Sequence, residues 1–178
     1  LYQELGLRGE VNFPAFEQAL KGFSRYASGQ DRLLVLIDYT KPSTEKRFYI
    51  LDLLQKKLLL STYVAHGGGS GDNYAVAFSN RPGSYQSSLG FFRTGDTYMG
   101  KNGYSLFLDG LEKGINDKAR ERAIVVHGAN YADPAVLKGQ QRLGRSLGCP
   151  ALPPDISKQV IDTIKGGVLL YIYGLNKA

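Results

Sequence analysis

Short apolar runs that end at polar or glycine-rich segments constrain the fold of this chain most strongly. Residues 32–38, 123–127 and 168–173 each contain at least four apolar residues in succession. Runs of this length, rich in branched and aromatic side chains, are typical of buried β-strands. They predict a mainly β protein whose central strands are buried.

Turn signals separate the other candidate strands. Glycine, proline and asparagine cluster at residues 80–83 and 100–103, where they favour a reversal of the chain. The runs on either side of residues 54–56 have the imperfect alternation of a hairpin. We therefore predict further strands at residues 47–53, 57–65, 74–78, 89–94 and 104–108.

Two amphipathic segments predict helices beside these strands. In residues 12–28 apolar side chains recur at helical spacing, Asn12 can cap the first turn, and Gly29 follows the last. Residues 153–165 carry a second apolar stripe and end at two glycines. The expected fold is one domain, residues 1–178, in which helices lie at the edges of a mostly β core.

Length and charge are consistent with this single domain. A chain of 178 residues with 43% hydrophobic residues is long enough for a sizeable core. Its net charge of +6 is compatible with an acidic partner and equally with a merely basic surface. The cations are scattered without a nucleic-acid motif, and residues 66–72 lack the Gly-Lys-Ser/Thr ending of a phosphate loop. We expect neither nucleic-acid nor nucleotide binding.

The only cysteine and one of the two histidines stand where nucleophilic chemistry is favoured. His127 ends an apolar run, and Cys149 lies between Gly148 and Pro150, where a sharp turn would expose backbone N–H groups. A thiol attacks as its thiolate, which a nearby imidazole can generate. The residues predict a Cys–His pair, with backbone donors of the turn stabilising an oxyanion.

Other interpretations of these residues stay open at the level of sequence. A lone cysteine is often simply a small buried apolar residue. The group that orients the imidazole could be Asp133, Asn130 or a backbone carbonyl. A zinc site built from His66, His127 and Cys149 lacks paired ligand spacing, so we expect no metal and no other cofactor.

A glycine-rich loop and several tyrosines indicate a surface that could face a substrate. His66 begins the loop of residues 66–72, from which it would line a cleft. Tyr85 and Tyr131, among others, could add aromatic rings and hydroxyls to that cleft. Tyrosine suits a half-buried sheet face equally well.

His127-Gly128 followed by Ser146-Leu147-Gly148-Cys149 resembles the catalytic signature of the L,D-transpeptidase catalytic domain (YkuD-type). In these bacterial peptidoglycan-remodelling enzymes, a His-Gly precedes Ser/Thr-His-Gly-Cys by a stretch of moderate length. The segment Ser88-Leu89-Gly90-Phe91 also resembles the family's segment entering the cleft. The resemblance covers residues 32–173 and leaves residues 1–30 as an N-terminal helical extension. It implies a β-sandwich or barrel-like sheet with flanking helices.

The resemblance implies a role for each residue of this signature. Cys149 would be the nucleophile and His127 its general base, oriented by the Gly128 carbonyl. Gly148 and Cys149 would supply backbone donors to the oxyanion, and Ser146 would precede them in the turn. The thiolate would attack the carbonyl between an L-centre and a D-residue of a tetrapeptide stem, releasing D-alanine. An amine of a neighbouring stem, or water, would then resolve the thioester.

Two departures from the family pattern concern substrate binding. Leu147 stands where many members have His, and Pro150-Ala151 stands where an apolar residue and Arg or Asn often follow the cysteine. These differences mark a divergent subgroup whose reaction could be hydrolysis or amine exchange. The predicted substrate-binding residues are Arg145, as a substitute cation, with His66, Tyr85, Ser88 and Tyr131.

The resemblance also implies a location and partners. It implies an extracytoplasmic enzyme, periplasmic or associated with the cell wall, that carbapenem-type β-lactams inactivate at Cys149 and that acts on donor and acceptor stem peptides. No apolar run approaches the length of a membrane span, and no signal peptide begins at Leu1. Alternatives are an L,D-carboxypeptidase, another cysteine peptidase or amidase, and a non-catalytic cell-wall-binding module.

Overall fold

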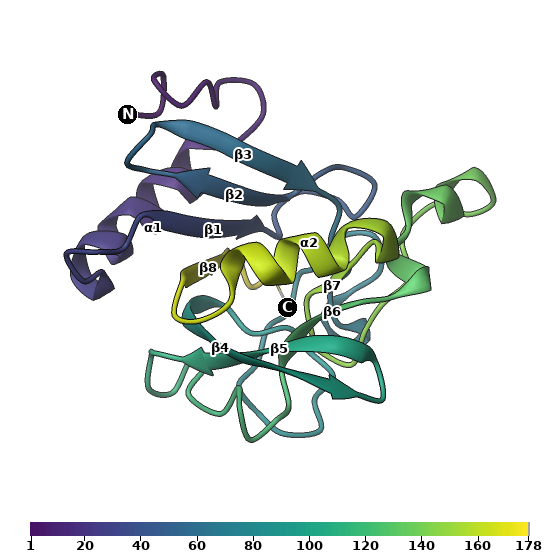
Figure 1. The fold of residues 1–178 in the computed structure, drawn as a ribbon. Helices are drawn as coiled ribbons and strands as arrows, with labels where there is room; N and C mark the ends of the chain where they lie inside the picture. Colours follow the sequence, from purple (N-terminus) through teal and green to yellow (C-terminus); the bar gives the residue numbers. More distant parts are fainter. Residues whose placement is uncertain (178) are drawn as a thin grey trace.

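The short apolar runs form the centre of a mixed eight-stranded sheet in the computed structural model, which describes residues 1–177 (Figure 1). Two helices flank the sheet, α1 (Phe13–Tyr26) and α2 (Pro154–Ile164). From edge to edge, the strands are β3 (Lys57–Thr62), β2 (Phe48–Asp52), β1 (Leu33–Asp38), β8 (Leu169–Tyr173), β4 (Gly90–Gly100), β5 (Gly103–Gly110), β6 (Val125–Gly128) and β7 (Ala151–Leu152).

The pairing of the strands brings the last one into the middle of the sheet. β8 pairs in parallel with β1 and antiparallel with β4, so it joins the two halves of the chain. Beyond β3, Ala65 pairs with Ala151 of β7, and Gly67 pairs with Ser146. These bridges bring the two ends of the sheet together and almost close it into a barrel. The predicted mainly β, barrel-like fold with flanking helices is confirmed.

Each helix covers a separate hydrophobic cluster. α1 lies beside β1 and β8 (Figure 1) and buries Ala15, Phe16 and Ala19 against them. α2 packs on β5 and β6, where Val160 and Ile161 contribute to the main core. The apolar spacing that predicted both helices is therefore the spacing of their buried faces.

Two predictions about the first helix need correction. Asn12 precedes α1 but does not cap it with its side chain, because Asn12 Nδ2 donates to Asp38 Oδ2 at 2.7 Å. The helix ends at Tyr26, before Gly29, so glycine does not terminate it. A tertiary contact has thus replaced the local capping interaction.

The predicted strands around the two turns have different outcomes. Residues 89–94 and 104–108 belong to one long hairpin, β4–β5, which reverses at the predicted turn between Gly100 and Gly103. Residues 74–78 form no strand. The backbone N–H groups of Val76 and Ala77 instead donate to the Ser70 carbonyl, so the glycine-rich loop holds this segment.

Candidate active site

The pairing of β6 with β7 brings His127 close to Cys149 in space. The two strands run in parallel with His127 opposite Ala151, and the His127 N–H donates to the Pro150 carbonyl at 3.4 Å. Cys149 therefore lies just before β7, the strand that pairs with the strand of His127. Both side chains are largely buried, with exposed fractions of 3% for His127 and 9% for Cys149.

The imidazole of His127 is held by the backbone of its own strand. Its Nδ1 lies 2.9 Å from the Gly128 carbonyl oxygen. A carbonyl can only accept, so Nδ1 carries the proton and Nε2 of the neutral ring keeps its lone pair. Burial lowers the pKa of His127, although the Gly128 carbonyl opposes that shift. The ring is thus neutral near pH 7, with Nε2 able to accept a proton.

The thiol of Cys149 is directed at the backbone that precedes β6. Its Sγ accepts from Val125 N–H and donates to the Ala123 carbonyl, each at 3.4 Å. Burial raises the pKa of Cys149, while the Val125 N–H and the charge of Arg122 partly offset this. Within residues 1–177, Sγ makes no hydrogen bond to His127. The thiol is therefore protonated near neutral pH, and its hydrogen bonds are to the backbone of residues 123 and 125.

The turn that carries Cys149 is closed by Ser146. Ser146 Oγ donates to the Cys149 carbonyl at 2.6 Å and accepts from Gly148 N–H at 3.1 Å. Gly148 has a φ of 129°, which a side chain would disfavour. Because the Gly148 N–H is engaged, only the Cys149 N–H of this predicted donor pair is without an acceptor in the described part of the chain. The resting turn therefore offers one backbone donor for an oxyanion.

The glycine-rich loop packs directly against this turn. A Cβ on Gly67 would lie 2.9 Å from Gly148 Cα and 2.5 Å from the Tyr85 carbonyl oxygen. Gly68 N–H donates to the Ser146 carbonyl at 2.8 Å, in the short 3₁₀ helix η1 (Gly68–Ser70). The glycines thus allow close contact between backbones.

His66 lies inside the protein instead of lining an open cleft. Its exposed fraction is 1%, with Nδ1 2.9 Å from Arg47 Nη2 and Nε2 3.2 Å from the Gly71 carbonyl. Burial, followed by the charge of Arg47, lowers the pKa of His66 to about 4. A neutral His66 therefore supports the glycine-rich loop from inside the fold, through its contact with the Gly71 carbonyl.

Arg122 is a residue that the sequence pattern did not single out. Its guanidinium donates to the carbonyls of Ser79 and Gln86 and to the hydroxyls of Ser88 and Ser84, at 2.6 to 3.2 Å. Among residues 1–177 it pairs with no carboxylate. It joins the segment before β6 to the loop beside Cys149, and it places an uncompensated positive charge near the thiol. Its partners lie more than thirty residues earlier in the chain, so no local motif marks it.

The other predicted substrate residues are distributed around this centre. Tyr131 is part-buried, and burial, followed by the charge of Cys149, raises its pKa to about 12. Tyr85 is 55% exposed beside the glycine-rich loop. Arg145 is exposed and donates to the Gly71 carbonyl at 3.3 Å, whereas Ser88 is buried and accepts from Arg122.

The remaining sequence hypotheses can be located as well. Asp133 accepts from Ala135 N–H, at the start of the 3₁₀ helix η3 (Pro134–Lys138), so the carbonyl of Gly128 is the group that contacts the His127 ring. Within residues 1–177 no three His, Cys, Asp or Glu side chains gather as they would around a metal ion. In the same residues, neither helix is long and apolar enough to span a bilayer.

The chain was compared with known protein families and with solved structures. The profile of the L,D-transpeptidase catalytic domain matches residues 7–173. The helical cell shape determining protein Pgp2 from Campylobacter jejuni is similar in structure, with 18% identity and a TM-score of 0.52, over 83% of this chain and 50% of that chain. An L,D-transpeptidase from Mycobacterium smegmatis has 13% identity and a TM-score of 0.48, over 80% of this chain and 59% of that chain.

This chain therefore spans about half to three fifths of the length of those two solved chains. A comparison with curated proteins gave no match. The similarity to Pgp2 concerns the fold alone, whereas the profile match extends over most of the sequence. On these grounds the chain belongs to the L,D-transpeptidase catalytic domain family.

Proposed function

We propose that this chain is a cysteine acyltransferase of the L,D-transpeptidase type, with Cys149 as nucleophile and His127 as general base. The observation that carries the proposal is the parallel pairing of β6 with β7, which brings the two residues together from either side of a long loop. The contact between His127 Nδ1 and the Gly128 carbonyl supports it, because it leaves Nε2 as the basic nitrogen.

The proposed reaction passes through a thioester. His127 Nε2 takes the proton of Sγ, and the thiolate attacks the stem carbonyl between the L-centre and the terminal D-residue. The Cys149 N–H donates to the developing oxyanion. The imidazolium returns its proton to the departing D-alanine amine as the C–N bond breaks. An amine of a second stem then attacks the thioester, loses its proton through His127, and restores the thiol.

The thiol must change its rotamer in this scheme. In the resting structure Sγ donates to the Ala123 carbonyl, away from the imidazole. Rotation about the Cα–Cβ bond exchanges that weak hydrogen bond for one to Nε2, and a neutral thiol is a poor nucleophile until this happens. A protonated resting cysteine is therefore consistent with a nucleophile that is activated only when a substrate is bound.

Arg122 is the proposed electrostatic support for the thiolate. The family's histidine before Gly-Cys is Leu147 here, an apolar side chain with an exposed fraction of 65%. Arg145, the cation expected to substitute, contacts the Gly71 carbonyl, whereas the charge of Arg122 acts on the thiol itself. We assign Arg122 the task of favouring the charged sulfur, and Arg145 and Tyr131 the binding of substrate groups at the rim.

The proposed substrate is peptidoglycan, and the proposed location is outside the cytoplasm, in the periplasm or at the cell wall. Family membership supports both, because the family's chemistry is acyl transfer on stem peptides. Carbapenem-type β-lactams would then acylate Cys149. The same thioester could be resolved by water, which would make the enzyme an L,D-carboxypeptidase.

The test is to incubate the protein and its Cys149→Ala variant with tetrapeptide muropeptides and to follow the products by mass spectrometry. Cysteine-dependent loss of D-alanine together with a new cross-linked dimer is the expected result. Loss of D-alanine with only a tripeptide product would establish hydrolysis instead. Turnover of an all-L tetrapeptide would indicate a general cysteine peptidase.

Identical mixtures from both proteins, with no carbapenem adduct on Cys149, would contradict the enzymatic proposal. A Cys149→Ser variant serves as a second control, because it keeps a small polar side chain at the same position. If Cys149→Ala binds the sacculus as tightly as the parent and neither turns over, a non-catalytic wall-binding module becomes the better description.

A further inference from the structure

One hollow in the described part of the molecule has neither Cys149 nor His127 in its lining. It has a volume of about 740 Å³ and runs between α1 and β8. This size is within the range of small-molecule and peptide pockets. We call it the α1–β8 groove and define it by residues that line it: Gln18, Lys21 and Arg25 from α1, Phe91 from β4, Glu112 from the segment after β5, and Tyr171 and Tyr173 from β8.

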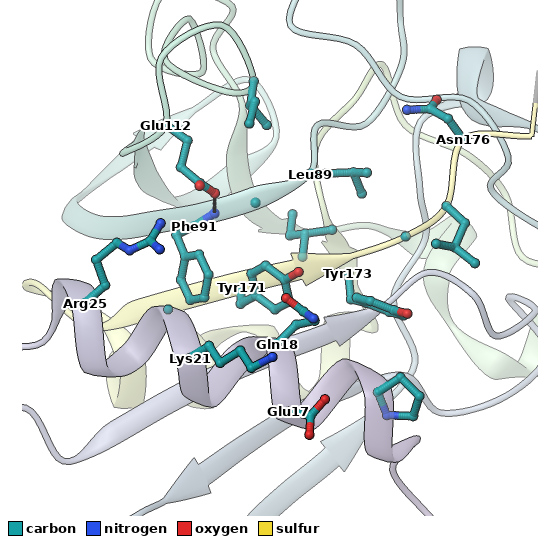
Figure 2. Close-up of a pocket in the computed structure, with 17 residues that line it drawn as sticks. Glu17, Gln18, Lys21, Arg25, Leu89, Phe91, Glu112, Tyr171, Tyr173 and Asn176 are labelled. Carbon is teal, nitrogen blue, oxygen red and sulfur yellow. Dashed lines mark hydrogen bonds between the residues drawn. The ribbon is translucent and has the colours of Figure 1, made fainter.

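The groove contains polar groups that the fold itself does not use. Lys21, Arg25 and Gln18 make no side-chain hydrogen bond or ion pair within residues 1–177, and neither do the hydroxyls of Tyr171 and Tyr173. Figure 2 shows Lys21 and Gln18 extending from the helix toward Tyr171, while Arg25 extends toward Phe91 and Glu112. An ammonium, an amide and a hydroxyl are thus available as donors at the centre of the groove.

The base of the groove is aromatic and rigid. The Phe91 and Tyr171 rings stack with centroids 4.3 Å apart. Gly22 of α1 packs directly on the Phe91 ring, where any side chain would clash. Glu112 accepts from the Phe91 N–H at 2.8 Å, the bond drawn in Figure 2, and its other oxygen accepts from Tyr26 at 3.4 Å. The site is therefore preorganised, with free donors above a fixed apolar surface.

The groove also continues toward the reactive cysteine. Leu89, Ile115 and Asn176 line it and also line a second hollow of about 220 Å³, which reaches Ser79. The Ser79 carbonyl is bound by Arg122, whose charge acts on the Cys149 thiol. A chain molecule lying in the groove could thus extend toward the loop beside the active site.

We propose that the α1–β8 groove binds a second stem peptide of the peptidoglycan polymer, by a free carboxylate at Lys21 and Gln18 and by small apolar side chains on the Tyr171 and Phe91 rings. A stem peptide carries free carboxylates, methyl side chains and an amine, for which Glu17 at the edge of the groove is a matching partner. This identification of the polymer rests on the proposed function, but the groove is separate from Cys149. It would hold the polymer while Cys149 reacts with another stem.

The experiment titrates the Cys149→Ala form of this chain, which lacks the proposed nucleophile, with a disaccharide tetrapeptide by calorimetry. The test variant adds Lys21→Glu and Arg25→Glu. The matched control adds Arg8→Glu and Lys57→Glu, which make the same change in net charge at exposed sites outside the groove. All four residues are exposed, so folding should persist and is checked by circular dichroism.

We expect the test variant to lose one binding event, or at least about tenfold in affinity, while the control keeps both; tenfold corresponds to about 1.4 kcal/mol. Binding should also weaken as the salt concentration rises. Equal isotherms for test and control variants would overturn the proposal. So would equal competition by the disaccharide without its peptide, since the occupant would then be the glycan.

The outcomes separate this inference from the proposed function. Groove-dependent binding without any cysteine-dependent turnover would retain the second site and reject the transpeptidase. Cysteine-dependent turnover with isotherms unaffected by the groove charges would retain the enzyme and reject the site.

Discussion

The turn around Cys149 and the α1–β8 groove differ in how completely their polar groups are paired. Around Cys149, the Ser146 hydroxyl, the Gly148 N–H and the thiol itself all have partners in the resting fold. In the groove, Lys21 and the tyrosine hydroxyls have none within residues 1–177, and the space between them is large. Tight pairing fixes the position of a reactive atom, whereas unpaired donors are free to bind a ligand.

The two regions also use glycine for different purposes. At Gly67 the absence of a side chain lets the glycine-rich loop contact the backbone of the cysteine turn. At Gly22 it lets helix α1 approach an aromatic ring at the base of the groove. In the first region glycine orders the turn that carries Cys149, and in the second it brings the helix onto the ring at the base of the groove. Substitutions that separate these effects can break or sharpen the comparison.

The largest effect is expected from His127→Gln. Loss of the basic nitrogen should lower cysteine-dependent turnover of tetrapeptide muropeptides by about a thousandfold, because general base catalysis is worth about two to four orders of magnitude. Product formation by mass spectrometry measures the loss, and circular dichroism checks that the variant is folded. Turnover by a folded His127→Gln variant at the rate of the parent would contradict the role of His127 as general base.

Gly67→Ala should have the next largest effect. The added Cβ would lie 2.5 Å from the Tyr85 carbonyl, so the loop must shift away from the cysteine turn. We expect a loss of about 2 kcal/mol in the free energy of unfolding, measured by urea denaturation, together with slower alkylation or acylation of Cys149. The control is Gly29→Ala, where a Cβ meets no atom within 4 Å. Unchanged stability in Gly67→Ala would disprove the close packing.

Arg122→Gln tests the charge near the thiol. Removing a cation destabilises the thiolate, so the pKa of Cys149, already raised by burial, should rise further. The pH at which the rate of alkylation by iodoacetamide increases would then be higher for the variant than for the parent protein. Near neutral pH the variant would react about tenfold more slowly, as for a shift of one pKa unit. Arg122→Lys should restore part of the rate.

Arg120→Gln is the matched control for that measurement. Arg120 lies two residues earlier, is exposed, and pairs with Asp109 instead of the loop beside Cys149. A pH profile for Arg122→Gln that coincides with the profile of Arg120→Gln would show that the thiol does not depend on Arg122.

Sequence patterns predicted the parts of this molecule that depend on neighbouring residues in the chain. The apolar runs predicted β1, β6 and β8, and helical spacing predicted both helices, because burial of one face imposes that spacing. Residues 74–78 were predicted to form a strand, but the backbone N–H groups of Val76 and Ala77 donate to the Ser70 carbonyl of the glycine-rich loop. The alternation of apolar and polar residues does not determine which acceptor a backbone N–H group will bind.

The candidate active site was likewise predicted only where it depends on residues close together in the chain. The order of His127, Gly128 and Cys149 along the chain allowed the pair to be proposed, since these residues form short motifs. Arg122 and the α1–β8 groove could not be anticipated, because each joins segments distant in sequence. The burial of His66 was missed for a related reason: its partner, Arg47, lies on the approach to another strand.

The smallest effect is expected at the start of α1, the helix that forms one wall of the groove. Asn12 Nδ2 donates to Asp38 Oδ2 at 2.7 Å, which anchors the helix to the end of β1. Asn12→Ala removes this bond from a buried carboxylate that keeps its contacts with Thr40, so we expect a loss of about 1 kcal/mol in urea denaturation. Gln18→Ala, on the same helix but without a side-chain partner in residues 1–177, should change stability by less. If Asn12→Ala reduces the free energy of muropeptide binding in the groove by more than it reduces the free energy of unfolding, anchoring of the helix controls the shape of the groove. If Asn12→Ala and Gln18→Ala have the same free energy of unfolding, the hydrogen bond to Asp38 does not anchor α1. Packing on β1 and β8 alone must then hold the helix in place.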